Sequence, residues 1–125
     1  MNRHAAVFAP ALFADEKDFQ GQLVSAAKRM GWSLVYHTRF STQSEPGFPD
    51  LVLVSTRQGR VLFVELKRDG ENPSVAQATW LAALGVCGQE VFCWRFADWN
   101  AALAILVRRP GGSPHERRAR EPDAA

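Results

Sequence analysis

The segment GFPDLVLVSTRQGRVLFVELKR, residues 47–68, contains two apolar runs separated by a few polar residues. Valine, leucine and phenylalanine dominate both runs, and Gly59 can supply the positive φ that a tight turn requires. The segment therefore predicts a β-hairpin with strands Asp50–Ser55 and Val61–Lys67. The whole chain of 125 residues has the length of one globular domain, so this hairpin belongs to its only core.

Polar residues interrupt this hairpin at its open end. Side chains alternate across a strand, so Glu65 and Lys67 share one face. If residues 58 and 59 form the turn, Asp50 lies opposite Lys67 and Val52 lies opposite Glu65. The hairpin then gathers two carboxylates and a lysine into one cluster, whereas a register slip of one residue would move Asp50 to the other face.

The rest of the chain alternates helical and extended patterns. We expect a helix at about Glu16–Met30 with Asp15 as its cap and Gly31 as its stop, a strand over Trp32–His37, a loop over Thr38–Pro49, a helix at about Ser74–Leu84 ended by Gly85, a strand over Glu90–Trp94 and a helix from its cap Asp98 to about Val107. The predicted order is α-β-β-β-α-β-α.

The ends of the chain differ from this pattern. The pattern of residues 1–14 predicts a loose N-terminal arm rather than an export signal. The composition of residues 108–125 predicts a disordered basic tail. The domain itself is expected to span residues 15–107. The net charge of +2 does not by itself indicate a nucleic-acid partner. The spacing of the cysteines and histidines suggests neither a zinc site nor a disulfide framework, and no run is long enough for a membrane helix, so we expect a cytoplasmic protein.

Glu16 lies three residues before Phe19 and seven before Leu23, on the helical stripe that must face the sheet. This acid could simply favour the helix N-terminus through the macrodipole. It could also join Asp50 and Glu65. Carboxylates that converge near a lysine suit a hard cation such as Mg²⁺, although E-x-K also occurs in ordinary surface ion pairs.

Four short motifs lie along the chain: E-x-x-x-Q at 16–20, GFPD at 47–50, VELK at 64–67 and S-x-x-Q-x-x-WL at 74–81. In this order and spacing they resemble the PD-(D/E)xK nuclease superfamily, and most of all its small virus-type replication-repair nuclease (VRR-NUC) domains. The resemblance runs from about residue 16 to 107. It implies an α/β restriction-endonuclease-like fold, with a central mixed β-sheet flanked by helices.

The resemblance also implies roles for individual residues. Glu16, Asp50 and Glu65 would bind Mg²⁺ or Mn²⁺ together with the peptide carbonyl of Leu66, and Lys67 would be the catalytic lysine. Gln77 would lie at the edge of the active site. Ser74 and Gln77 also fit a capping box, so their role could instead be only to stabilise the N-terminus of a helix.

The implied activity is a metal-dependent DNA endonuclease that is structure-selective for branched or junction DNA in replication, repair or recombination. Its implied partners are branched or duplex DNA and a second copy of the chain in a homodimer. The alternative is a non-cleaving DNA-binding subunit of a larger assembly. Core packing is favoured for at least three of the four tryptophans over stacking on bases. Phosphate contacts are plausible for Lys17, Lys28, Arg29, Arg57, Arg60 and Arg68.

Overall fold

The computed structural model describes residues 13–39 and 45–107. Its elements follow the predicted order, with one short 3₁₀-helix added: α2 (Glu16–Arg29), β1 (Leu34–His37), β2 (Leu51–Ser55), β3 (Arg60–Lys67), α3 (Val75–Val86), β4 (Glu90–Arg95), η2 (Phe96–Asp98) and α4 (Trp99–Val107). The predicted N-terminal arm up to residue 12 and the predicted basic tail lie outside the described residues.

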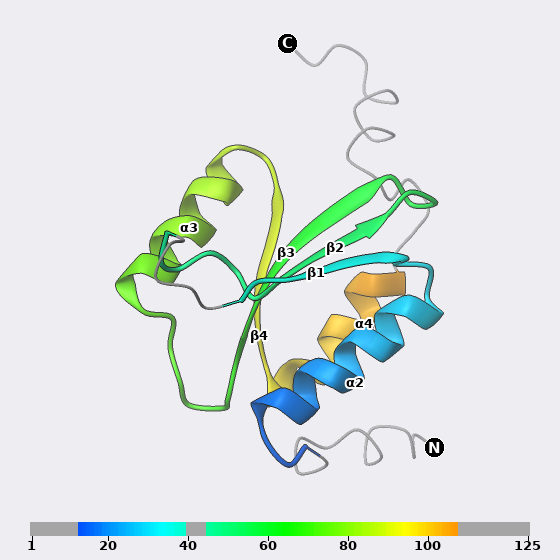
Figure 1. The fold of residues 1–125 in the computed structure, drawn as a ribbon, viewed down its shortest axis with the longest axis horizontal. Coiled ribbons are helices and arrows are strands. Elements are labelled where there is room, and N and C mark those ends of the chain that lie inside the picture. The colour runs from blue at the N-terminus through cyan, green and yellow to red at the C-terminus, as the bar shows by residue number, and fades with distance from the viewer. Residues whose placement is uncertain (1–12, 40–44, 108–125) are drawn as a thin grey trace.

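The strands form one mixed sheet in the order β1-β2-β3-β4. β1, β2 and β3 are antiparallel neighbours, whereas β4 is parallel to β3. Figure 1 shows α2 and α4 side by side on one side of the sheet and α3 on the other. The predicted α/β fold, a mixed sheet flanked by helices, is therefore confirmed.

The core lies between the sheet and the pair of helices α2 and α4. Alternate sheet residues point into it and are almost completely buried, namely Leu51, Leu53, Leu62, Val64 and Leu66. Phe19 and Leu23 of α2 meet them, as the helical spacing predicted. Phe13 is also buried and packs edge-on against Phe19, so the core extends into the segment that we assigned to the N-terminal arm.

The hairpin register differs from the predicted one by two residues. Val52 lies opposite Phe63 rather than Glu65, and Ser55 pairs with Arg60. The turn contains four residues, 56–59, because the N–H of Gln58 donates to Ser55 Oγ at 3.1 Å. A shift of two residues keeps every side chain on its predicted face, so Asp50 stays on the side of Glu65 but no longer lies opposite Lys67.

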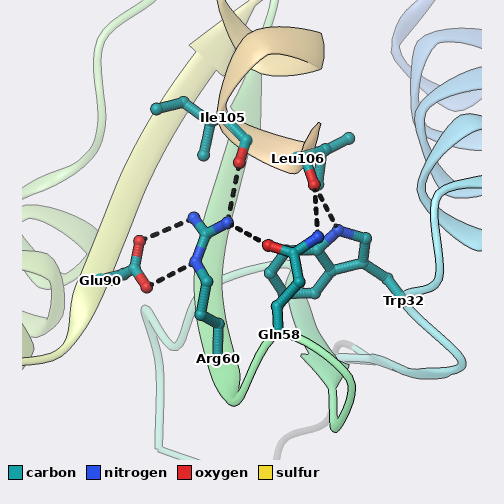
Figure 2. A network of polar contacts seen from close by, with 6 residues as sticks. All are labelled: Trp32, Gln58, Arg60, Glu90, Ile105 and Leu106. Carbon is teal, nitrogen blue, oxygen red and sulfur yellow. Dashed lines mark hydrogen bonds and ion pairs between the residues drawn. The ribbon is translucent and has the colours of Figure 1, made fainter. Parts of the chain in front are cut away.

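A buried polar network around Arg60 fixes this register (Figure 2). The Arg60 guanidinium donates to both carboxylate oxygens of Glu90, at 3.0 and 2.9 Å, and also to the side chain of Gln58 and the carbonyl of Ile105. Its centre lies 5.1 Å from the Trp32 ring centroid. Arg60 is 2% exposed, so the expectation that it contacts phosphate was wrong.

The end of α3 and the start of α4 also differ from the predicted boundaries. α3 continues through Gly85, and the chain turns at Gly88, whose φ is +85°. The Asp98 carboxylate accepts from the N–H of Arg95 within a 3₁₀ turn instead of capping α4. Three of the four tryptophans, Trp32, Trp94 and Trp99, are buried, as predicted. Among the described residues, none of the helices is both long and apolar enough to cross a membrane.

Candidate active site

Asp50 lies where β2 begins, beside the end of β3. Its Oδ2 accepts a hydrogen bond of 2.8 Å from the N–H of Leu66, and its carbonyl accepts from the N–H of Thr38 at 2.8 Å. Because the N–H and C=O of one strand residue point to the same side of the strand, the Leu66 carbonyl faces the same edge as Asp50. The structure thus brings Asp50 and the predicted carbonyl ligand together.

Glu65 is the buried acid of this site. It is 2% exposed, and its Oε1 has no hydrogen-bond partner within the described part of the chain. Burial, followed by the nearby Asp50 carboxylate, raises the pKa of Glu65 to about 8, against the opposing effect of Lys67. Buried polar atoms are nearly always paired, so this oxygen is an unusual feature of the site.

Lys67 lies on the same face of β3 as Glu65, as the alternation predicted. Its Nζ is 3.8 Å from Glu65 Oε2, and its side chain is 17% exposed while that of Glu65 is 2% exposed. The ammonium group is therefore close to the acid but still reachable from solvent.

Glu16 is less closely associated with Asp50 than Glu65 is. It is half-buried at the start of α2, and its pKa is raised mainly by desolvation and then by the charge of Asp50. Residues 13–39 and 45–107 nevertheless contain no group of three or more His, Cys, Asp or Glu side chains that could hold one ion. The structure therefore joins Asp50 to Glu65 but leaves Glu16 outside, and its role as a ligand stays a prediction.

Gln77 takes part in the capping box that the sequence allowed. The N–H of Gln77 donates to Ser74 Oγ at 3.1 Å, while its own Oε1 accepts from the N–H of Ser74 at 2.8 Å. The capping box is thus confirmed. Gln77 also lines a groove that contains Asp50, so its position in the capping box does not remove it from the site.

This groove has a volume of about 650 Å³ and runs from Asp50 between β1, α3 and the segment before β2. Its aromatic lining is formed by Tyr36, Phe48 and Trp80. Of these, only Trp80 belongs to the tryptophans that the sequence marked for core packing or base stacking. The available signals were that Phe48 lies inside the GFPD motif and that Tyr36 lies in the strand that leads into the loop.

The donors present fit a hard divalent cation. Asp50 and Glu65 supply carboxylate oxygens, and Leu66 offers a backbone carbonyl on the same edge. Mg²⁺ and Mn²⁺ prefer such oxygen ligands, and Mg²⁺ commonly uses only one or two carboxylates while keeping several waters. The unpartnered Glu65 Oε1 is the feature that a cation would satisfy.

Comparison with known proteins identifies the family of the chain. No curated protein matches the chain. A solved structure described as a VRR-NUC domain protein is 20% identical with a TM-score of 0.59, and the match covers 74% of this chain and 86% of the other. A second, described as a VRR-NUC domain, is 25% identical with a TM-score of 0.50, covering 68% and 91%. Residues 5–106 match the family model of the VRR-NUC domain, a nuclease-type domain, so the chain belongs to the VRR-NUC family.

Proposed function

We propose that this protein is a metal-dependent endonuclease that hydrolyses DNA phosphodiester bonds with Mg²⁺ or Mn²⁺. The observation that carries the proposal is the buried, unpartnered Glu65 Oε1 beside Asp50, with the Lys67 ammonium 3.8 Å from the other Glu65 oxygen. A non-cleaving DNA-binding subunit has no use for a buried acid without a hydrogen-bond partner beside a second carboxylate. The intact acids and lysine therefore favour an enzyme over a binding module.

Each residue would have a separate role in hydrolysis. Asp50, Glu65 and the Leu66 carbonyl would hold the ion, with Glu16 turning toward it from α2. The bound ion would supply Lewis-acid polarisation of the phosphodiester and a lower pKa for an attacking water. Lys67 would orient that water or stabilise negative charge at the phosphate, and Gln77 would donate to the substrate from the side of the groove.

The test is a cleavage panel. We expect the protein to cut DNA in Mg²⁺ or Mn²⁺ and to lose that activity in EDTA, because the carboxylates alone cannot polarise a phosphodiester. End-labelled single-stranded, duplex, flap and four-way-junction DNA should be compared at equal concentration, and we expect the branched flap and junction DNA to be cut fastest. Binding to these DNAs without cleavage in either metal would support the non-cleaving alternative.

We also infer that the enzyme acts as a homodimer through the outer side of α3. This helix has no buried residue, and its exposed stripe is apolar, with Val75 86% and Val86 88% exposed. Ala78 and Ala82 continue the stripe at helical spacing. Exposed apolar stripes of this kind favour association. Gln77 and Trp80 lie on the groove side of the same helix, so the two active sites would stay open to a branched substrate.

The dimer is tested with Val86→Glu, which should separate the subunits because it places a charge in an apolar contact. Light scattering at micromolar concentration should give the mass of a dimer for wild type and of a monomer for this variant. Val107→Glu is the matched control, since Val107 is a 46% exposed valine at the end of α4. A wild-type monomer with full activity on a junction would contradict the dimer.

A further inference from the structure

The groove beside Asp50 has an aromatic lining that the hydrolytic chemistry does not use. Phe48 and Trp80 pack edge to face with centroids 5.0 Å apart, and the indole N–H of Trp80 donates to the carbonyl of Pro46 at 3.1 Å. This side of the groove is therefore fixed. Tyr36 differs, since it is 61% exposed and makes no ring contact with another described residue. It is an open aromatic surface at the site.

The sheet places Tyr36 next to the acids. Tyr36 pairs with Val52, and Asp50 lies two residues before Val52 on the same face. Diagonal neighbours of this kind have Cα atoms about 7–8 Å apart. The hydrogen bond from the Thr38 N–H to the Asp50 carbonyl continues the pairing of the two chains up to Asp50. The ring is therefore adjacent to a carboxylate that we propose holds the metal ion.

The groove has the size and polar groups of a ligand site. Its volume of about 650 Å³ lies within the usual range for small-molecule pockets, about 300–1,000 Å³. Gln77 uses its Oε1 in the capping box, but its amide nitrogen has no protein acceptor among the described residues. The exposed Arg39 adds a cation to the lining, which also contains the exposed acid Glu45. The flat rings, the Gln77 amide donor and the Arg39 cation together match a base and its phosphate.

We propose that this groove receives an unpaired nucleobase of the strand that is cut, stacked on Tyr36. The proposal rests on the proposed nuclease function and adds to it a substrate class: phosphodiesters next to an unpaired nucleotide. In a duplex the base faces are already covered by neighbouring bases, so the Tyr36 ring can stack only on a base that has left the helix. Flaps, mismatches and junction arms supply such bases.

Binding is measured first, in EDTA, so that no cleavage is needed. A duplex with one unpaired 2-aminopurine reports stacking through quenching of its fluorescence, and the fully paired duplex is its control. We expect quenching by wild type and by Tyr36→Phe, which keeps the ring. Tyr36→Leu should bind the unpaired substrate about tenfold more weakly, a loss that corresponds to one base–aromatic stack. Affinity for the paired duplex should change much less.

Cleavage is measured second, as the ratio of rates on the unpaired and the fully paired substrate in Mg²⁺ or Mn²⁺. Tyr36→Leu should lower this ratio about tenfold, and Tyr36→Phe should preserve it. An unchanged ratio and unchanged quenching would overturn the inference, as would a change in molecular mass on light scattering, because Tyr36 would then be a subunit contact. If no DNA is cut but quenching follows the ring, the nuclease function fails and the groove inference stands.

Discussion

Lys67→Ala should slow metal-dependent DNA cleavage by about 10²–10⁴-fold while leaving DNA affinity within a few-fold. The Lys67 ammonium is the basic group in contact with Glu65, and loss of one group that orients a nucleophile or stabilises transition-state charge has effects of this size. Binding depends on many phosphate contacts, so one of them contributes little. Single-turnover rates and filter-binding affinities on the same labelled DNA separate the two effects.

The matched control is Lys28→Ala. Lys28 lies in the last turn of α2, is exposed and carries the same charge. Its loss should alter the salt dependence of binding slightly and leave the cleavage rate within a few-fold. Cleavage by Lys67→Ala at close to the wild-type rate would remove Lys67 from the mechanism, and a similar loss in both variants would show a general effect of charge.

The alternation of side chains was sufficient to place Glu65 and Lys67 on one face of the hairpin. Glu65 and Lys67 share a face whatever the register, and a register error of two residues preserves that face. The register itself was not predictable from local sequence. It depends on a four-residue turn held by Gln58 and Arg60, whose partners Glu90 and Leu106 are distant in the sequence. Turn chemistry alone favoured the shorter turn around Gly59.

In the site too, contacts between residues close in the sequence were predictable, and contacts between distant residues were not. The S-x-x-Q spacing predicted the capping box of Gln77, because its contacts are three residues apart. The hydrogen bond from the Leu66 N–H to Asp50 was not predicted, since it depends on where β2 begins relative to β3. The exposed Tyr36 was missed because its importance comes from the groove, which is assembled from segments far apart in the chain.

Asp50→Asn should leave the metal-free protein as stable as wild type, or more stable, at pH 8, and should abolish most of the stabilisation by Mg²⁺ or Mn²⁺. The Asp50 carboxylate is the second cause, after burial, of the raised pKa of Glu65. Two neighbouring negative charges oppose each other's ionisation, so the metal-free site is unfavourable when Asp50 and Glu65 are both charged. Asparagine removes one charge at nearly constant shape and keeps an oxygen that can accept from the Leu66 N–H.

The stability of the metal-free protein should fall as the pH rises. The pKa of Glu65 is about 8 in the folded protein and 4.5 ordinarily, so the folded state holds the proton more tightly than the unfolded state. Wild type in EDTA should therefore lose stability as the pH rises from about 4.5 to about 8. Asp50→Asn should show a shallower loss, because Glu65 then ionises without a charged neighbour. The advantage of the variant should consequently be largest near pH 8 and smallest near pH 5.

Bound metal should make wild type more stable than Asp50→Asn, the reverse of their order in EDTA. A ligand that binds only the folded state stabilises it by about 2.7 kcal/mol at a hundredfold excess over its Kd. For a domain of this length that corresponds to a rise in Tm on the order of 10 °C. Thermal melting in EDTA and across a Mg²⁺ or Mn²⁺ titration measures both effects. Asp50→Ala, which also loses the acceptor for the Leu66 N–H, is the control for hydrogen bonding and should melt lowest in EDTA. If Asp50→Asn melts several degrees below wild type in EDTA at pH 8 and gains as much from metal, Asp50 is a structural residue and the metal site is wrong.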